Sequence, residues 1–218
     1  MKTIRTMRPI RLALAVVALL TGSACERASA PAAPPAAALS PAPAAPSPAW
    51  LTDRSAYPLI GMTAPAFSAD LSGGGKVSEA ALMGHWTILA FWGLWSDDSI
   101  ADAKYIRALV SAAEADPDLD FLSIHTPPGP GRDAEALGSF RSLASWFANQ
   151  GGPWPTGLDP DGKIATAFRV NSAPVYLLIG PDLTIEAYRT QLASTPDDGI
   201  KPVIRGYTEI RKQIASPG

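Results

Sequence analysis

Four consecutive polar side chains follow an apolar segment near the middle of the chain: Ser96, Asp97, Asp98 and Ser99. A serine hydroxyl becomes a nucleophile when a neighbouring base accepts its proton and a carboxylate orients that base. His125 is a candidate base, so a serine hydrolase built on Ser96 or Ser99 is one hypothesis. The sequence contains neither a G-x-S-x-G elbow nor an S-x-x-K motif, so no motif supports this hypothesis.

The carboxylates of this segment suggest a second chemistry, the binding of a hard cation through oxygen ligands. Asp98 and Asp102 are four residues apart and would share one face of a helix, with Asp97 beside them. Nothing around them resembles a calcium-binding loop, and residues 159–162 also lack the remainder of such a loop. The chain has only two histidines and one cysteine, so we expect no metal and no cofactor.

A structural interpretation also accounts for the four residues. Ser96 is a favourable residue for capping a helix N-terminus, because its hydroxyl can accept a backbone N–H. Asp97 and Asp98 would then lie in the first turn, where each carboxylate stabilises the helix dipole by about 0.3 to 1 kcal/mol. The segment is therefore predicted to start a helix, and no catalytic residue is expected in it.

The elements that must position these residues alternate between strand and helix patterns. Residues 86–92 form an almost continuous apolar run, which is typical of a strand buried on both faces. Further strands are predicted at residues 119–125, 175–179 and 184–189, and helices at residues 96–115, 136–147, 161–168 and 200–214. This order predicts an α/β fold with helices on both faces of a mixed sheet, part parallel and closed by an antiparallel C-terminal hairpin.

The first 24 residues have the pattern of a secretory signal peptide. They carry four basic residues and no acidic one, followed by nine apolar residues at 12–20 and then small residues. Nine apolar residues are too few to cross the roughly 30 Å hydrocarbon core of a membrane. Residues 1–24 are therefore predicted to direct export and to be removed.

Two cleavage sites remain open at the end of this segment. Residues 20–25 resemble a bacterial lipobox, which would make Cys25 the lipidated first residue of the mature protein, whereas an A-x-A site would place cleavage after Ala30. In residues 31–48, 15 of 18 residues are Ala or Pro and none is charged, which is typical of an extended linker. Residues 25–48 are thus predicted to tether a folded domain, residues 49–218, to a membrane in the periplasm or cell envelope.

Composition excludes several classes of protein. Cys25 is the only cysteine, so the chain alone can form neither an internal disulfide nor a site of several thiolates. The formal net charge is −2, and binding to nucleic acid needs clustered basic residues. No nucleic-acid partner is expected.

Two separated stretches of the predicted domain share the pattern of one known family. The first comprises residues 70–78, Gly84 and residues 91–99 (FWGLWSDDS), and the second comprises residues 158–162 and 170–179 (VNSAPVYLLI). They resemble the thioredoxin-like, TlpA-type disulfide reductases of the bacterial envelope, which belong to the redoxins. The resemblance runs from about residue 65 to the C-terminal helix, and it implies a thioredoxin-like fold with a cis proline at Pro174.

The chain departs from this family at the reactive positions. In the family a Trp is followed by Cys-x-x-Cys at a helix start, whereas here Trp95 is followed by Ser96 and, three residues later, Ser99. Thiol-disulfide exchange proceeds by thiolate attack on a disulfide sulfur, so it requires sulfur. Peroxidatic and copper-delivering relatives need cysteine as well. The resemblance therefore implies a redox-inactive member of the family.

The resemblance also covers the surface that faces a polypeptide in the family. Trp92, Trp95 and Pro174 are predicted to form a shallow apolar site for an extended polypeptide or an envelope protein. Two alternatives stay open. One is a role in envelope thiol chemistry or cytochrome c maturation in which a partner supplies the thiols, and the other is the serine hydrolase described above.

Overall fold

The computed structural model describes residues 50–193 and 199–216. The predicted signal peptide, Cys25 and the Ala/Pro-rich linker lie outside the described residues, so those predictions stay as they were. Among the described residues, none of the helices has the length and apolar character needed to cross a membrane.

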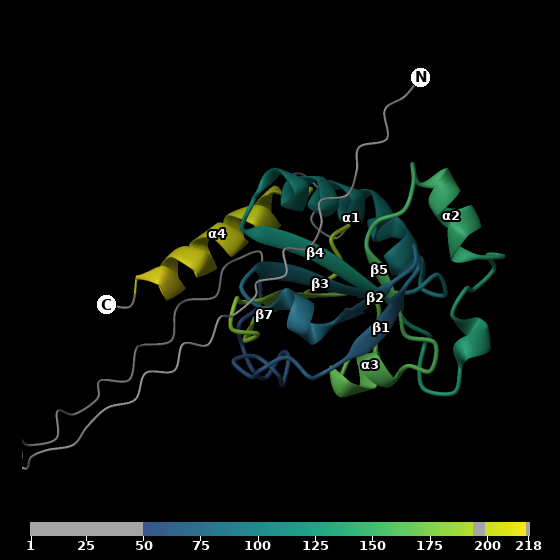
Figure 1. The fold of residues 1–218 in the computed structure, drawn as a ribbon, viewed down its shortest axis with the longest axis horizontal. Helices are drawn as coiled ribbons and strands as arrows, with labels where there is room; N and C mark the ends of the chain where they lie inside the picture. Colours follow the sequence, from purple (N-terminus) through teal and green to yellow (C-terminus); the bar gives the residue numbers. More distant parts are fainter. Residues whose placement is uncertain (1–49, 194–198, 217–218) are drawn as a thin grey trace, which may run out of the picture. The chain divides into compact units, whose positions relative to one another are not determined.

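The described residues are built on a seven-stranded mixed sheet (Figure 1). The strands are β1 (Ser68–Leu71), β2 (Lys76–Ser78), β3 (Trp86–Trp92), β4 (Leu119–His125), β5 (Thr156–Leu158), β6 (Val175–Ile179) and β7 (Ile185–Thr190). Their order in the sheet is β2-β1-β5-β4-β3-β6-β7. Strands β3, β4 and β5 are parallel, and β6 and β7 form an antiparallel hairpin. The predicted parallel part and C-terminal hairpin are therefore confirmed.

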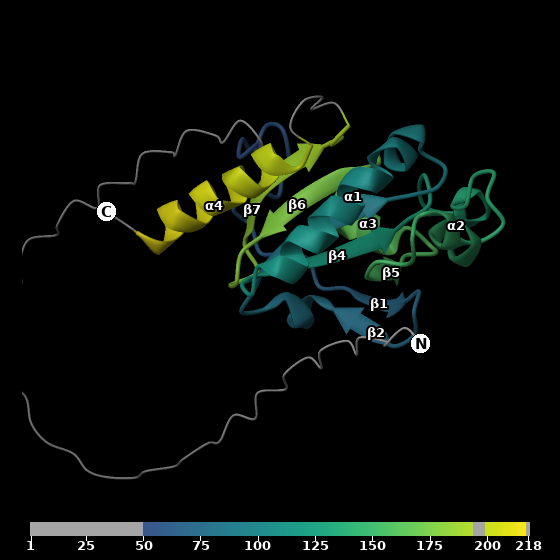
Figure 2. The same cartoon turned by 90° about the horizontal axis from the view of Figure 1, so that it is seen from above.

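Helices cover both faces of this sheet. They are α1 (Asp97–Ala115), α2 (Leu143–Asn149), α3 (Lys163–Ala167) and α4 (Lys201–Ala215), with short 3-10 turns at Glu79–Leu82 and Asp133–Glu135. Figure 2 shows α1 and α4 crossing the same face of the sheet, with α1 over β4 and α4 beside β7. Helix α3 packs on the opposite face, where Ile164 and Ala165 contribute to a second hydrophobic cluster.

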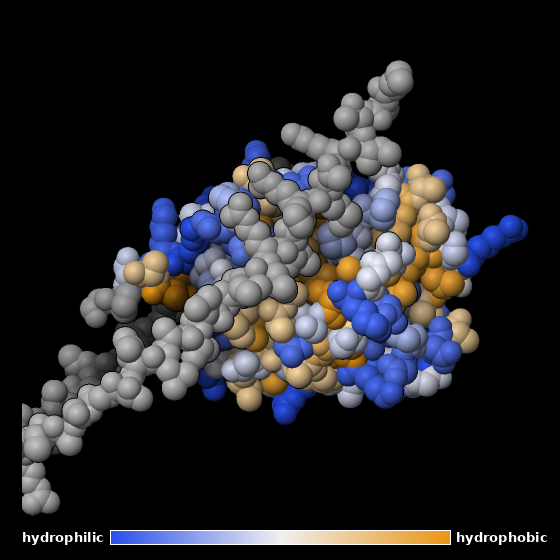
Figure 3. All heavy atoms as spheres, in the orientation of Figure 1, coloured by the Kyte–Doolittle hydropathy of each residue, from blue (hydrophilic) through white to orange (hydrophobic). Residues whose placement is uncertain are grey.

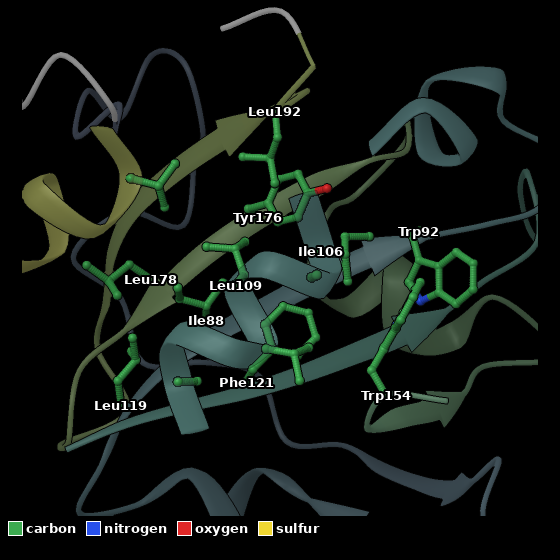
Figure 4. Close-up of a cluster of buried hydrophobic side chains, with 14 of the residues drawn as sticks. Ile88, Trp92, Ile106, Leu109, Leu119, Phe121, Trp154, Tyr176, Leu178 and Leu192 are labelled. Carbon is green, nitrogen blue, oxygen red and sulfur yellow. The ribbon is translucent and has the colours of Figure 1, made fainter. Parts of the chain in front are cut away.

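The central strand β3 connects the two hydrophobic clusters. All seven of its residues are buried, because β4 and β6 flank it and helices cover both faces. Side chains alternate between faces along a strand, so Ile88 and Trp92 join the cluster under α1 and α4 while Leu89 and Phe91 join the other. Figure 4 shows the first cluster, with Trp92 and Trp154 side by side at one end.

The predicted helix over residues 136–147 is wrong in most of its length. The helix that forms, α2, begins only after Ser142, whose hydroxyl accepts the N–H of Ser145. Gly138 has a φ of +52°, a left-handed conformation that interrupts a helix. A Cβ atom at Gly138 would lie 2.5 Å from the carbonyl oxygen of Leu94, so this close approach also requires glycine.

Strands β1, β2 and β5 were not predicted. They are three or four residues long, and an alternating pattern cannot be distinguished over so few positions. Strand β1 pairs antiparallel with both β2 and β5, so these strands extend the sheet beyond its parallel part.

Candidate functional site

The segment of residues 96–99, with its two serines and two aspartates, lies at the carboxyl edge of the parallel strands. Strands β3 and β4 end together, with Trp92 paired to His125, and α1 starts directly after Ser96. Ligand sites of α/β folds form at this edge, because loops follow the strand ends there. The predicted placement of His125 at the same edge as Ser96 is confirmed.

Ser96 caps α1 and also contacts a distant loop. Its Oγ accepts the N–H of Ser99 at 3.2 Å and donates to the carbonyl oxygen of Ala173 at 2.7 Å. The side chain of Ser99 is fully buried, and its Oγ accepts the N–H of Gly93 at 3.4 Å. Both hydroxyls therefore have backbone partners, and the prediction of a helix cap at Ser96 is confirmed.

The loop that Ser96 contacts contains the predicted cis proline. The peptide bond between Ala173 and Pro174 is cis, as the resemblance implied. Pro174 itself is buried, while Asn171 and Ser172 just before it are exposed. This loop therefore brings exposed polar residues and backbone beside the start of α1.

The two tryptophans predicted to line a surface occupy different places. Trp92 is fully buried; its Nε1 donates to Ser123 Oγ at 3.0 Å, and its ring packs against Trp146 and Trp154. It is a core residue and does not reach a surface. Trp95 is only partly buried, and its Nε1 donates to the carbonyl oxygen of Thr126 at 2.8 Å. Trp95 alone of the pair faces the site.

The three carboxylates considered for a cation do not converge. Asp102 is fully buried and accepts the N–H groups of Leu192 and Ala193, at 2.7 and 2.6 Å, and the hydroxyl of Tyr176. Asp98 is exposed and accepts from Gln191 Nε2. Within the described ranges, no group of three or more histidine, cysteine or acidic side chains is placed to hold a metal ion.

His125 does not act as a partner for either serine. It is 6% exposed, its ring packs edge-on against Trp92, and its Nε2 has no hydrogen-bond partner among the described residues. Burial lowers the pKa of His125 to about 4, against the effect of a hydrogen bond with the backbone of Ala136. A neutral imidazole without contact to a hydroxyl forms no catalytic dyad, so the geometry does not support the hydrolase hypothesis.

The buried His125 should make stability depend on pH. Its pKa is lowered from 6.5 to about 4 on folding, so the unfolded state binds more protons between these values. Stability is then full above about pH 6.5 and falls as the pH falls towards 4, with about 2 kcal/mol lost at about pH 5. Urea unfolding at about pH 7 and at about pH 5 measures this loss.

A matched pair of variants isolates the contribution of His125. His125→Phe removes the titrating group and should abolish most of the loss between about pH 7 and 5. His85 is half exposed beside Asp120, and His85→Phe should leave the loss unchanged. An equal pH dependence in wild type and His125→Phe would contradict the prediction.

Two adjoining hollows open at this edge of the sheet, with volumes of about 470 and 420 Å³. Both are lined by Trp95, Pro128, Asn171 and Ser172, so they form one continuous groove. The first hollow extends over the proline-rich loop 127–130 towards Arg169, and the second reaches Ser96 and Asp98. Figure 3 shows hydrophobic surface gathered around α2, with hydrophilic residues interspersed.

Several residues of the groove were not among the sequence predictions. The loop 127–130 was not considered as part of a site, although it follows the end of β4 by one residue, which is the signal that places it at this edge. Arg169 and Asn171 follow the short helix α3, and only the fold brings them beside Trp95.

Comparison with solved structures gives relatives of the same architecture. One is a protein assigned as the thiol:disulfide interchange protein DsbE from Chlorobium tepidum, with 15% identity, 69% of this chain and 96% of that chain covered, and a TM-score of 0.55. Another is the thioredoxin domain of a thiol-disulfide oxidoreductase from Bacteroides vulgatus, with 16% identity, 68% and 96% coverage and a TM-score of 0.52. A thiol-disulfide oxidoreductase from Bacteroides fragilis has 19% identity, 66% and 98% coverage and a TM-score of 0.51. Comparison with curated protein sequences finds no match.

The sheet order, the cis proline loop and these neighbours define a protein of the α/β thioredoxin-like fold. The model of the AhpC/TSA family matches residues 60–188, which is more than half of the chain. The chain belongs to the AhpC/TSA family.

Proposed function

We propose that this protein is a binding protein of the bacterial cell envelope, in which the thioredoxin-like fold holds an extended polypeptide and carries out no redox chemistry of its own. The contact of Ser96 Oγ with the carbonyl oxygen of Ala173, at 2.7 Å, is the observation that carries the proposal. It puts a hydroxyl beside the cis proline loop, at the position where the family resemblance implies a reactive thiol. A hydroxyl cannot form a mixed disulfide.

The groove supports the binding part of the proposal. A partly buried tryptophan and a run of prolines provide apolar contact area, and Asn171 and Ser172 provide exposed polar groups at the rim. Extended polypeptides are commonly recognised by such combinations of apolar contacts and exposed backbone groups. Trp95 has the largest side chain of the four residues that line both hollows, so it is the central contact.

The binding function is tested by photo-crosslinking from position 95. A crosslinking amino acid in place of Trp95 should capture an extended polypeptide partner in the native envelope. The same amino acid at Met83, which is exposed and precedes the opposite end of β3, should not. The purified chain should reduce insulin no faster than the Ser96→Ala/Ser99→Ala variant. Turnover above that variant, or equal capture from both positions, would contradict the proposal.

The position in the envelope is proposed from the N-terminal sequence and from the resemblance. Residues 1–24 would direct export, and a lipid on Cys25 with the uncharged linker would hold the domain near a membrane. The mass of the mature N-terminus distinguishes a lipidated Cys25 from cleavage after Ala30. A mature protein that keeps residues 1–24 would contradict both forms of the proposal.

A further inference from the structure

The two ends of the groove differ in charge. The hollow towards α3 is lined by one charged residue, Arg169, and the hollow towards α1 is lined by Asp98, Arg132 and Glu135. The residues that both hollows share, Trp95 and Pro128 among them, carry no charge. The charged groups therefore lie at opposite ends of an uncharged middle section.

Arg169 provides an available positive charge at its end. Its side chain is exposed and has no ion pair with any carboxylate in the part of the chain that the structure describes. The other residues that line this hollow are uncharged, so nothing in the hollow neutralises the guanidinium. An anionic group of a ligand would meet a free donor there.

The backbone at Arg169 ends helix α3 and fixes where this side chain starts. Arg169 follows the end of α3 with a φ of +53°, in the left-handed region that glycine adopts without cost. The N–H of Val170 donates to the carbonyl oxygen of Ala165 at 2.8 Å, which closes the helix end and accounts for this conformation. Glycine would adopt this backbone more readily, so the arginine side chain is not needed to form the helix end.

The opposite end keeps a net negative charge. Arg132 and Glu135 pair with each other through Nε and Oε1 at 2.7 Å, so their charges cancel. Asp98 accepts a hydrogen bond from Gln191 Nε2 at 2.6 Å, and an amide leaves the charge of the carboxylate in place. Asp97, the exposed neighbour of Asp98 on α1, adds to the negative potential there.

We propose that the groove selects extended polypeptides that carry an acidic residue at the Arg169 end and a basic residue at the Asp98 end. This inference rests on the proposed function, and it names the class of polypeptide and its orientation. An extended polypeptide can carry an acidic and a basic side chain with uncharged residues between them. This arrangement complements the charges at the two ends of the groove. The chain's own residues 31–48 carry no charge and do not complement the groove.

The test uses labelled synthetic peptides and the purified protein. The peptides share an uncharged core of variable length and carry acidic then basic ends, basic then acidic ends, or neutral ends. Fluorescence anisotropy at low salt should show about tenfold tighter binding of one charged order than of the neutral peptides, because two exposed charge pairs contribute about 1 kcal/mol or less each. High salt should reduce this preference.

Charge exchange between the two ends gives the decisive comparison. Arg169→Glu/Asp98→Lys leaves the net charge unchanged and should invert the preferred order of charges in the peptide. Asp70→Lys/Lys76→Glu exchanges an exposed ion pair on β1 and β2 and should keep the wild-type preference. If the exchanged variant does not fold, Arg169→Gln and Asp98→Asn should each reduce the preference by about threefold.

The possible outcomes distinguish the charge selection from the proposed polypeptide-binding function. If Trp95→Ala weakens binding but neutral peptides bind as well as charged ones, or if the preference is not inverted, the charge selection is wrong and the binding function stands. If no peptide binds and position 95 captures nothing, the binding function is wrong. Arg169→Gly should unfold at an equal or higher temperature than wild type while losing the preference, which a purely structural arginine would not do.

Discussion

Replacing Ser96 and Ser99 with cysteine should convert this protein into a disulfide reductase. The two residues are three apart at the start of α1, on one side of the helix, and the Oγ of Ser96 already lies 3.2 Å from the backbone nitrogen of Ser99. A helix N-terminus favours the thiolate form of cysteine. With a small dithiol as the terminal reductant, we expect Ser96→Cys/Ser99→Cys to reduce insulin at about tenfold or more the background rate seen with wild type. The first thiolate opens the insulin disulfide, the second resolves the mixed disulfide, and the reductant restores the two thiols.

Two further variants make this result specific. Ser96→Cys alone should form mixed disulfides without turnover, because no second thiol resolves them. Adding Asp97→Ala and Asp98→Ala to the double variant should lower the pKa of the first thiol, since two carboxylates in the same turn oppose the thiolate. If the two new thiols cannot pair, the placement of these residues at one site is wrong.

Asp102→Ala should destabilise the fold by about 3 to 5 kcal/mol, a large part of the 5 to 15 kcal/mol of a typical domain. The fully buried carboxylate accepts from two backbone N–H groups and from the hydroxyl of Tyr176. Alanine would leave the N–H of Leu192 and the hydroxyl of Tyr176 buried without partners, which costs about 1 to 3 kcal/mol for each group, whereas Ala193 is exposed to water. Urea unfolding, with an unchanged dependence on denaturant, measures the loss.

Asp120 provides the matched control for Asp102. It lies on β4 with its side chain more than half exposed, so Asp120→Ala should change stability by less than about 0.5 kcal/mol. Asp102→Asn keeps one acceptor oxygen and should fall between the two. A loss from Asp102→Ala as small as that from Asp120→Ala would show that the buried contacts contribute little.

The sequence predicted those parts of the fold whose pattern is long enough to read. Strand β3 is an uninterrupted apolar run, and α1 has an apolar stripe over five turns, so both were placed to within one residue. Strands β1, β2 and β5 are too short for such a pattern. The helix expected over residues 136–147 does not form at Gly138, which has a left-handed backbone and lies close to Leu94. The spacing of apolar residues along the sequence does not indicate such a contact.

The candidate site was predictable where it follows a strand or caps a helix. Ser96 and Trp95 come from such positions and line the groove, whereas Pro174 is buried and lines neither hollow. Trp92 is part of the core because alternation along β3 points it under α1, which a continuous apolar run cannot reveal. Arg169 was not predicted, since only the fold brings it to the same hollow as Trp95.

The unequal burial of the six tryptophans gives the molecule an optical reporter of its own. Five of them, Trp50, Trp86, Trp92, Trp146 and Trp154, are at most 6% exposed, and Trp95 is the exception. A water-soluble quencher such as iodide would collide with the indole of Trp95 and hardly with the others. The fraction of tryptophan emission that iodide quenches therefore reports the fraction of molecules whose groove is empty. A bound polypeptide would shield Trp95 and restore its emission, with no label on either molecule.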